Sequence, residues 1–97
     1  MIDDDLKYEI EQFILRRIDH ENKLKGIREP FAEPCDAEEA ASIREIFNDE
    51  DIYIEFSVDG IAAYQNREQI AIGKRIWDPK PIGRVYKEVK PKLVWMT

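Results

Sequence analysis

The stretch DIYIEFSVDGIAAYQ, residues 51–65, decides the fold class because it has the pattern of a β-hairpin. Its first half alternates between apolar and polar residues, which indicates a half-buried strand with one face made of Ile52, Ile54, Phe56 and Val58. The Asp59-Gly60 pair that follows is typical of a type I′ turn, in which both central residues have positive φ. This turn predicts an antiparallel register that pairs Val58 with Ile61, Phe56 with Ala63 and Glu55 with Tyr64.

A long helix is expected before the hairpin. It begins at Asp3, Asp4 or Asp5 and ends at Gly26, since apolar residues recur at helical spacing at Leu6, Ile10, Phe13, Ile14 and Leu24. The opposite side, which we expect to face solvent, carries Asp5, Glu9, Gln12, Arg16, Asp19 and Lys23. Arg16, Asp19 and Lys23 are three and four residues apart, so they are expected to pair along the helix.

A second, shorter helix is expected after an extended connector that contains Pro30 and Pro34. Asp36 at the N-cap and Glu39 three residues later match a capping box, and the helix runs to about Phe47. Its buried face is expected to hold Ala37, Ala40, Ile43, Ile46 and Phe47. Glu38 and Glu45 then point to solvent.

The C-terminal third continues the sheet. Residues 66–77 fit a strand from about 69 to 77 or a helix that starts at Asn66, and Gly73 favours the strand. After the turn at 78–81, residues 82–89 and 92–96 are predicted strands separated by Pro91. The fold class is therefore α+β, with two N-terminal helices packed on one face of a four- to five-stranded antiparallel meander, in a single domain over residues 1–97.

Composition places the chain among cytoplasmic globular domains. It has 97 residues, 43% of them hydrophobic, and a net charge of -6. Its first residues are acidic where a signal peptide is basic, it has no apolar run of about 20 residues, and Cys35 is its one cysteine. The net charge disfavours direct binding of nucleic acid or anionic membrane by the whole chain.

The charge is distributed unevenly along the sequence. Residues 1–59 carry 18 acidic and 7 basic side chains, a net charge of -11, whereas residues 60–97 carry 3 acidic and 8 basic ones, a net charge of +5. Between Glu29 and Asp51, nine acidic residues are opposed by Arg44 alone. The two parts either neutralise each other within the fold or across a homodimer, or leave an anionic surface that a basic partner recognises.

Residues suited to catalysis or metal binding are few. The single histidine, His20, is expected on the helix surface, and His20 and Cys35 are too few for a structural zinc site or a specific nucleophile and base pair. The acidic run at 49–51 lacks the twelve-residue loop of an EF-hand, and the chain has no glycine-rich phosphate loop. We therefore expect a protein that is not an enzyme and needs no cofactor or metal.

An acidic helix offers charge at a spacing similar to that of nucleic acid. Carboxylates four residues apart on a helix lie about 6 Å apart, comparable with the phosphates of a nucleic-acid strand. In size and charge the chain is similar to phage-encoded anti-defence proteins, such as anti-CRISPR and anti-restriction nucleic-acid mimics. That similarity implies an inhibitor that blocks the basic channel of a nucleic-acid-binding protein or complex. The partner-binding residues are expected to be Glu29, Glu33, Asp36, Glu38, Glu45, Asp49, Glu50 and Asp51.

Two other functions remain open from the sequence. The order of helix, short helix, hairpin and strands is similar to that of cystatin-like α+β domains, which implies a small-molecule or enzymatic pocket near Tyr53, Glu55 and Tyr64. The third possibility is single-stranded nucleic-acid binding by the basic C-terminal strands. The residues that suggest it are Lys74, Arg75, Arg84, Lys87, Lys90 and Lys92, interleaved with Trp77, Tyr86 and Trp95.

Overall fold

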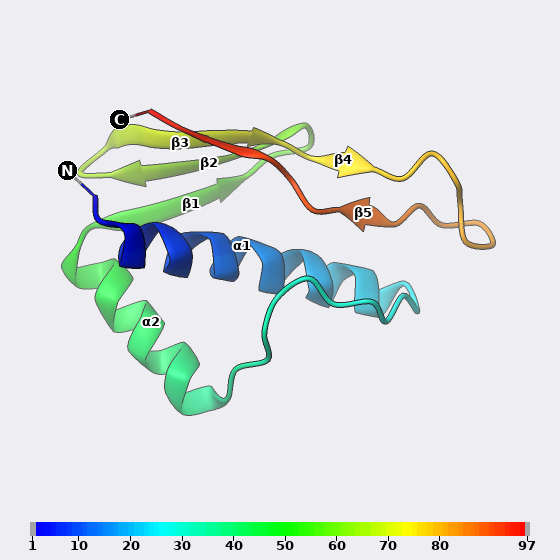
Figure 1. Cartoon of the computed structure of the whole chain (residues 1–97), viewed down its shortest axis with the longest axis horizontal. Coiled ribbons are helices and arrows are strands. Elements are labelled where there is room, and N and C mark those ends of the chain that lie inside the picture. Colours follow the sequence, from blue (N-terminus) through cyan, green and yellow to red (C-terminus); the bar gives the residue numbers. More distant parts are fainter. Residues whose placement is uncertain (1, 97) are drawn as a thin grey trace.

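The computed structural model describes residues 2–96 and shows an α+β fold, as the sequence predicts (Figure 1). Helix α1 (Asp4–Leu24) lies along one face of a four-stranded antiparallel sheet, and helix α2 (Ala37–Asp49) diverges from it on the same side (Figure 1). Asp3 caps α1, because its carboxylate accepts a hydrogen bond from the backbone N–H of Leu6 at 2.8 Å. Asp36 caps α2 in the same way through the N–H of Glu39, also at 2.8 Å, which confirms the predicted helix start.

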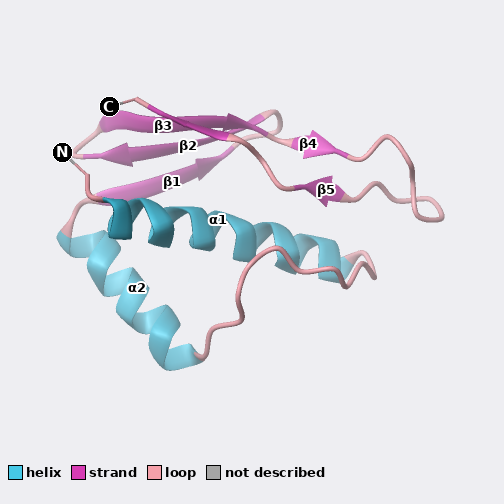
Figure 2. Cartoon of the chain, in the orientation of Figure 1, coloured by secondary structure: helices cyan, strands magenta, loops and turns pink. Residues whose placement is uncertain are grey.

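The main sheet has the strand order β1-β2-β3-β6, formed by β1 (Ile52–Phe56), β2 (Gly60–Gln65), β3 (Glu68–Lys74) and β6 (Leu93–Trp95). Strands β4 (Ile76–Trp77) and β5 (Glu88–Val89) pair with each other and form an arm that extends beyond the main sheet (Figure 2). The segment with two possible interpretations thus forms two strands, β3 and β4, and not a helix. The strand predicted over 82–89 is wrong for most of its length: only Glu88–Val89 is strand, while Ile82 and Val85 form an isolated bridge.

The first hairpin differs from the predicted register by two residues. Phe56 pairs with Ile61 and Glu55 with Ala62, and Ser57 N–H donates to the carbonyl of Gly60 at 2.9 Å. Val58 and Asp59 therefore form the two-residue loop, and neither they nor Gly60 has positive φ. A Cβ on Gly60 would lie 3.2 Å from the carbonyl oxygen of Gly73, so this glycine permits close strand approach. Because side chains alternate with period two, the shift leaves every strand residue on its predicted face.

The type I′ pattern occurs instead in the second hairpin. Gln65 pairs with Glu68, and the two residues between them, Asn66 and Arg67, both have positive φ, at 51° and 67°. Asparagine tolerates this conformation well, but a long side chain such as that of Arg67 does so at a cost. The turn signal was missed because this pair lacks the glycine that usually marks the second position.

We expect Arg67→Gly to raise the free energy of unfolding by roughly 0.5–1 kcal/mol, because glycine has no Cβ to strain at φ of 67°. Urea denaturation of the two proteins measures this change. In Glu68→Gly, the matched control one residue further on, glycine enters a strand and should lower stability by a similar amount. A lower stability of Arg67→Gly than of the native chain would contradict this account of the turn.

The core lies between α1 and the inner face of the sheet. Its buried members come mainly from α1, the two central strands β2 and β3, and the end of α2, and they include Ile10, Ile14, Ile18, Phe47, Ile61, Ala63 and Ala71. Helix α2 contributes much less than predicted: Phe47 is buried, but Ile46 is 42% exposed and Ala37 is exposed. Leu24, predicted to be buried, is 75% exposed at the end of α1. The short helix is therefore mostly a surface element.

The side of α1 that was expected to face solvent binds the connector between the helices. The carboxylate of Asp19 accepts hydrogen bonds from the N–H groups of Phe31 and Ala32, at 2.8 and 2.9 Å. Arg16 Nε donates to the carbonyl of Glu33 at 3.1 Å, and Gln12 Oε1 accepts from the N–H of the same residue. Arg16, Asp19 and Lys23 consequently do not form the predicted pairs among the ion pairs of residues 2–96.

Candidate functional site

The predicted partner-binding carboxylates lie along α2 and the segments that flank it. All of them are exposed, and we call this set the acidic surface: Glu29, Glu33, Asp36, Glu38, Glu45, Asp49, Glu50 and Asp51. The helix does not bring them into one patch. Since α2 has 13 residues and rises 1.5 Å per residue, its two ends are about 20 Å apart. The acidic surface is thus a ridge with one group of carboxylates at each end.

The group at the N-terminal end of α2 borders a hollow of about 500 Å³ between α1 and α2. Glu33, Asp36 and Glu38 line this hollow. Two of these residues also have structural roles: Asp36 caps α2, and Glu33 Oε2 lies 3.5 Å from the hydroxyl of Tyr8. The other group, Asp49, Glu50 and Asp51, follows the last turn of α2.

Few of these carboxylates are neutralised within the molecule. Glu29 forms an ion pair with Lys87, and Glu50 accepts a hydrogen bond from Gln65 Nε2 at 3.3 Å. Among residues 2–96, no carboxylate of α2 takes part in an ion pair, and the last turn of α2 has no basic residue. The negative charge of Glu38, Glu45 and Asp49 is therefore available to a partner.

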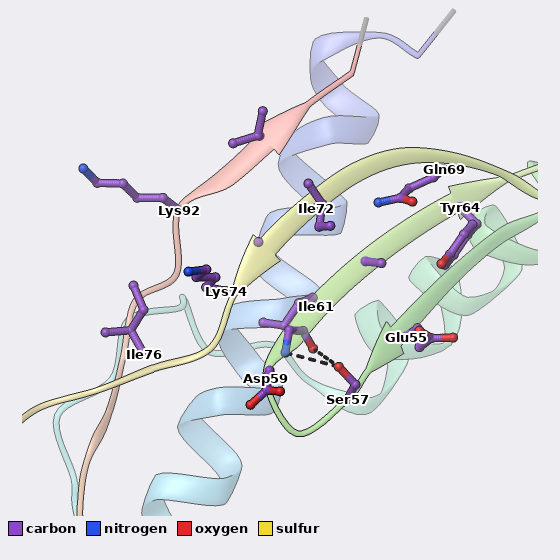
Figure 3. A pocket seen from close by; sticks show the side chains of 14 residues that line it. Glu55, Ser57, Asp59, Ile61, Tyr64, Gln69, Ile72, Lys74, Ile76 and Lys92 are labelled. Carbon is purple, nitrogen blue, oxygen red and sulfur yellow. Dashed lines mark hydrogen bonds between the residues drawn. The ribbon is translucent and has the colours of Figure 1, made fainter.

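A second exposed surface is the face of the sheet opposite α1, shown in Figure 3. It forms an open groove of about 670 Å³, with apolar side chains such as Ile72, Ile76 and Val94 along its length. Lys74 and Lys92 lie at one side of this groove and Glu55 at the other (Figure 3). The alternation of apolar and polar residues in β1 predicted that the strand has an outer face. No pattern in the sequence predicted that this face of the whole sheet stays uncovered.

The residues of the predicted cystatin-like pocket lie on this outer face. Tyr53 and Tyr64 are paired across β1 and β2, with ring centroids 6.2 Å apart, and Tyr53 is 61% exposed. Together with Glu55 they line a shallow hollow of about 310 Å³. The structure brings these three side chains together on the face opposite the core, as predicted.

Two of the six basic residues predicted as nucleic-acid contacts, Arg75 and Lys87, form ion pairs inside the molecule. The guanidinium of Arg75 donates hydrogen bonds to both carboxylate oxygens of Glu88, at 2.7 and 3.2 Å, and to the carboxylate of Glu21 at 2.7 Å. Hydrogen bonding to Glu88 raises the pKa of Arg75 above its ordinary value, so the guanidinium stays charged. Trp95 Nε1 donates to Glu11 at 3.0 Å. Arg75, Lys87 and Trp95 are thus unavailable as the predicted nucleic-acid contacts, while Trp77 and Tyr86 are 38% and 52% exposed.

The cluster around Arg75 was not recognised in the sequence. Glu88, 1% exposed, lies at the base of the arm, and its backbone forms two hydrogen bonds with the side chain of Asn22, which is also buried. One signal was present: a single acidic residue, Glu88, within a basic segment. Two neighbouring residues of α1, Glu21 and Asn22, therefore bind Arg75 and Glu88, which are 54 and 66 residues further along the chain, and attach the arm to the end of the helix.

Within residues 2–96, no group of three or more histidine, cysteine, aspartate or glutamate side chains has a geometry that would hold a metal ion. No helix in this part of the chain is long and apolar enough to cross a membrane. His20 is exposed on α1, and Cys35 is half-buried in the connector. Comparisons with protein-family models, with curated proteins and with solved structures found no match to this chain.

Proposed function

We propose that this protein is a non-enzymatic binding protein whose acidic surface engages a basic partner in the cytoplasm. The observation that carries the proposal is the set of α2 carboxylates that form no ion pair with any residue from 2 to 96, on a helix that diverges from the sheet (Figure 1). The carboxylates of this helix are exposed, so they can contact a partner at the protein surface with little loss of hydration. They also attract a basic partner over a distance of about one Debye length.

The partner class we propose is a nucleic-acid-binding protein or complex with a Lys- and Arg-lined channel. Glu45 and Asp49 are one helical turn apart, so their carboxylates repeat at about the spacing of backbone phosphates. Such a partner would lose nucleic-acid binding when this protein occupies the channel, as in the anti-defence inhibitors that it is similar to in size and charge.

Reversing charge on α2 is expected to abolish partner binding. The double variant Glu38→Lys and Glu45→Lys changes the net charge by four units at two exposed positions. The matched control, Asp59→Lys with Glu68→Lys, makes the same change at two exposed positions of the sheet, in the first hairpin loop and at the first residue of β3. We expect the native chain and the control to capture the partner at low salt and to release it as salt rises.

A competition assay then tests the mimicry. The captured protein is incubated with labelled DNA or RNA, and the native chain should displace the nucleic acid whereas the α2 variant should not. Binding that is insensitive to salt, or that survives the α2 reversal, would contradict the proposal. Capture without displacement of nucleic acid would contradict the mimicry but leave an acidic binding surface.

A further inference from the structure

The outer face of the sheet carries apolar side chains in its centre and opposite charges at its two edges. The strand register places Glu55, Ala62, Ile72 and Val94 side by side in one row across the four strands. Val94 is 62% exposed and Ile72 is 45% exposed, because helices cover the other face only (Figure 1). An exposed apolar patch of this kind marks an interaction surface.

We propose that a second copy of this chain covers the face, and that the two sheets pack about a two-fold axis parallel to the strands. Such an axis exchanges the two edges of the sheet, so β1 of one copy lies opposite β6 of the second copy, and β2 lies opposite β3. Face-to-face packing of sheets with nearly aligned strands is a common arrangement, at a separation of about 10 Å.

The side chains of the central row are complementary in size under this axis. Ala62 on β2 lies opposite Ile72 of the second copy, and the two-fold axis repeats this contact. The small side chain of Ala62 in each copy therefore provides space for the larger Ile72 of the other. In the next row towards the hairpin loop, Gly60 lies opposite Lys74 of the second copy. The axis therefore places a small residue of β2 against a larger residue of β3 in both rows.

The charges at the edges select the same axis. Glu55 lies on β1 at one edge of the sheet. Lys92 lies at the opposite edge, just before β6, and is two residues before Val94, the member of β6 in the row of Glu55. The proposed axis brings Glu55 of each copy to the edge that carries Lys92 of the other, about 7 Å along the strand, within reach of a lysine side chain. An axis perpendicular to the strands would instead place Glu55 against Glu55 of the second copy. Charge complementarity therefore favours the parallel axis.

The size of the face indicates a weak dimer. Four strands about 4.8 Å apart and five residues at about 3.4 Å give a face of roughly 15 by 17 Å. This is well below the roughly 800 Å² per partner of a standard interface, so we expect association only at high protein concentration. Helix α2, which carries Glu38, Glu45 and Asp49 of the acidic surface, lies on the helix side of the sheet and stays accessible in such a dimer (Figure 1).

Sedimentation equilibrium between 10 and 500 µM tests the proposal. The apparent mass of the native chain should rise from 11.5 kDa towards twice that value as the concentration increases, and Ile72→Asp should remain a monomer throughout. The matched control is Ile46→Asp on α2, since Ile46 is 42% exposed and lies outside the face. It should dimerise like the native chain. A native chain that is monomeric at 500 µM overturns the proposal and leaves the face to a different partner.

A charge exchange tests the orientation of the axis and does not depend on a substitution in the centre of the sheet. Glu55→Lys alone and Lys92→Glu alone should each weaken the dimer several-fold, because each places like charges at the same edge. The double variant Glu55→Lys with Lys92→Glu should restore native affinity. Tighter association of either single variant, or failure of the double variant to recover, overturns the proposed axis.

Discussion

Arg75→Met is expected to lower the free energy of unfolding by about 3–5 kcal/mol, the usual cost of removing one partner from a buried ion pair. The guanidinium binds both oxygens of Glu88, whose side chain is only 2% exposed, and it also contacts Glu21 at 2.7 Å. Methionine fills a similar volume but leaves the carboxylate of Glu88 buried and uncompensated. The ring of Trp77, 5.4 Å from the guanidinium carbon, would lose its cation–π contact as well.

Urea denaturation of three variants separates this charge effect from lost packing. In Arg75→Met with Glu88→Met, the uncompensated charge is absent, so we expect most of the lost stability to return. Arg84→Met, at an exposed position in the loop of the arm, should change stability by less than about 0.5 kcal/mol. If the double variant is less stable than Arg75→Met, the ion pair itself is stabilising and the proposed cause is wrong.

Asn22→Ala is expected to lower the free energy of unfolding by about 2–4 kcal/mol. The Asn22 side chain is 1% exposed; its Nδ2 donates to the carbonyl of Glu88 at 3.0 Å, and its Oδ1 accepts from the N–H of the same residue at 3.1 Å. Alanine removes both partners and leaves two buried backbone groups unsatisfied, each at about 1–3 kcal/mol. The amide of Asn22 thus forms the two backbone hydrogen bonds of Glu88 that a neighbouring strand would otherwise form with β5.

Hydrogen exchange locates this effect more precisely than denaturation does. In Asn22→Ala, the amide of Glu88 should exchange much faster, whereas the amides of β2 should change only with global stability. His20→Ala, at an exposed position of the same helix, should leave both stability and the exchange of Glu88 near native values. Unchanged protection of the Glu88 amide would contradict the proposed role of Asn22.

The pattern of apolar residues was sufficient for the fold class. Alternation over 52–56 and helical periodicity over 4–24 depend on which neighbours along the chain share a face, so the sequence predicts them directly. The helix start at Asp36 was also predicted, and that of α1 was limited to Asp3, Asp4 or Asp5, because a cap is a contact between residues three positions apart. The position of the first turn was wrong, because Asp59-Gly60 has the residue types of a type I′ turn but Val58 and Asp59 form the loop; the two positive φ angles occur at Asn66 and Arg67 in the second hairpin.

The candidate sites were predicted in part. The exposure of Glu38 and Glu45 follows from helical periodicity, and the structure places both on the surface of α2. Other features depend on residues that are far apart in the sequence. These are the uncovered face of the sheet, the attachment of the connector to Asp19 and the cluster around Arg75. Their partners depend on how α1 crosses the sheet, which no local pattern specifies.

The sequence by itself thus determined the two helices, the alternating first strand and the excess of negative charge between residues 29 and 51. Only the tertiary structure decided which of these charges stay unpaired. Arg75, which the sequence offered as a nucleic-acid contact, is held by Glu21 and Glu88, while the α2 carboxylates have no such partner within the described chain. The physical reason is that an ion pair requires proximity in space, and the packing of α1 on the sheet brings distant segments together at one end of the molecule and leaves α2 apart at the other.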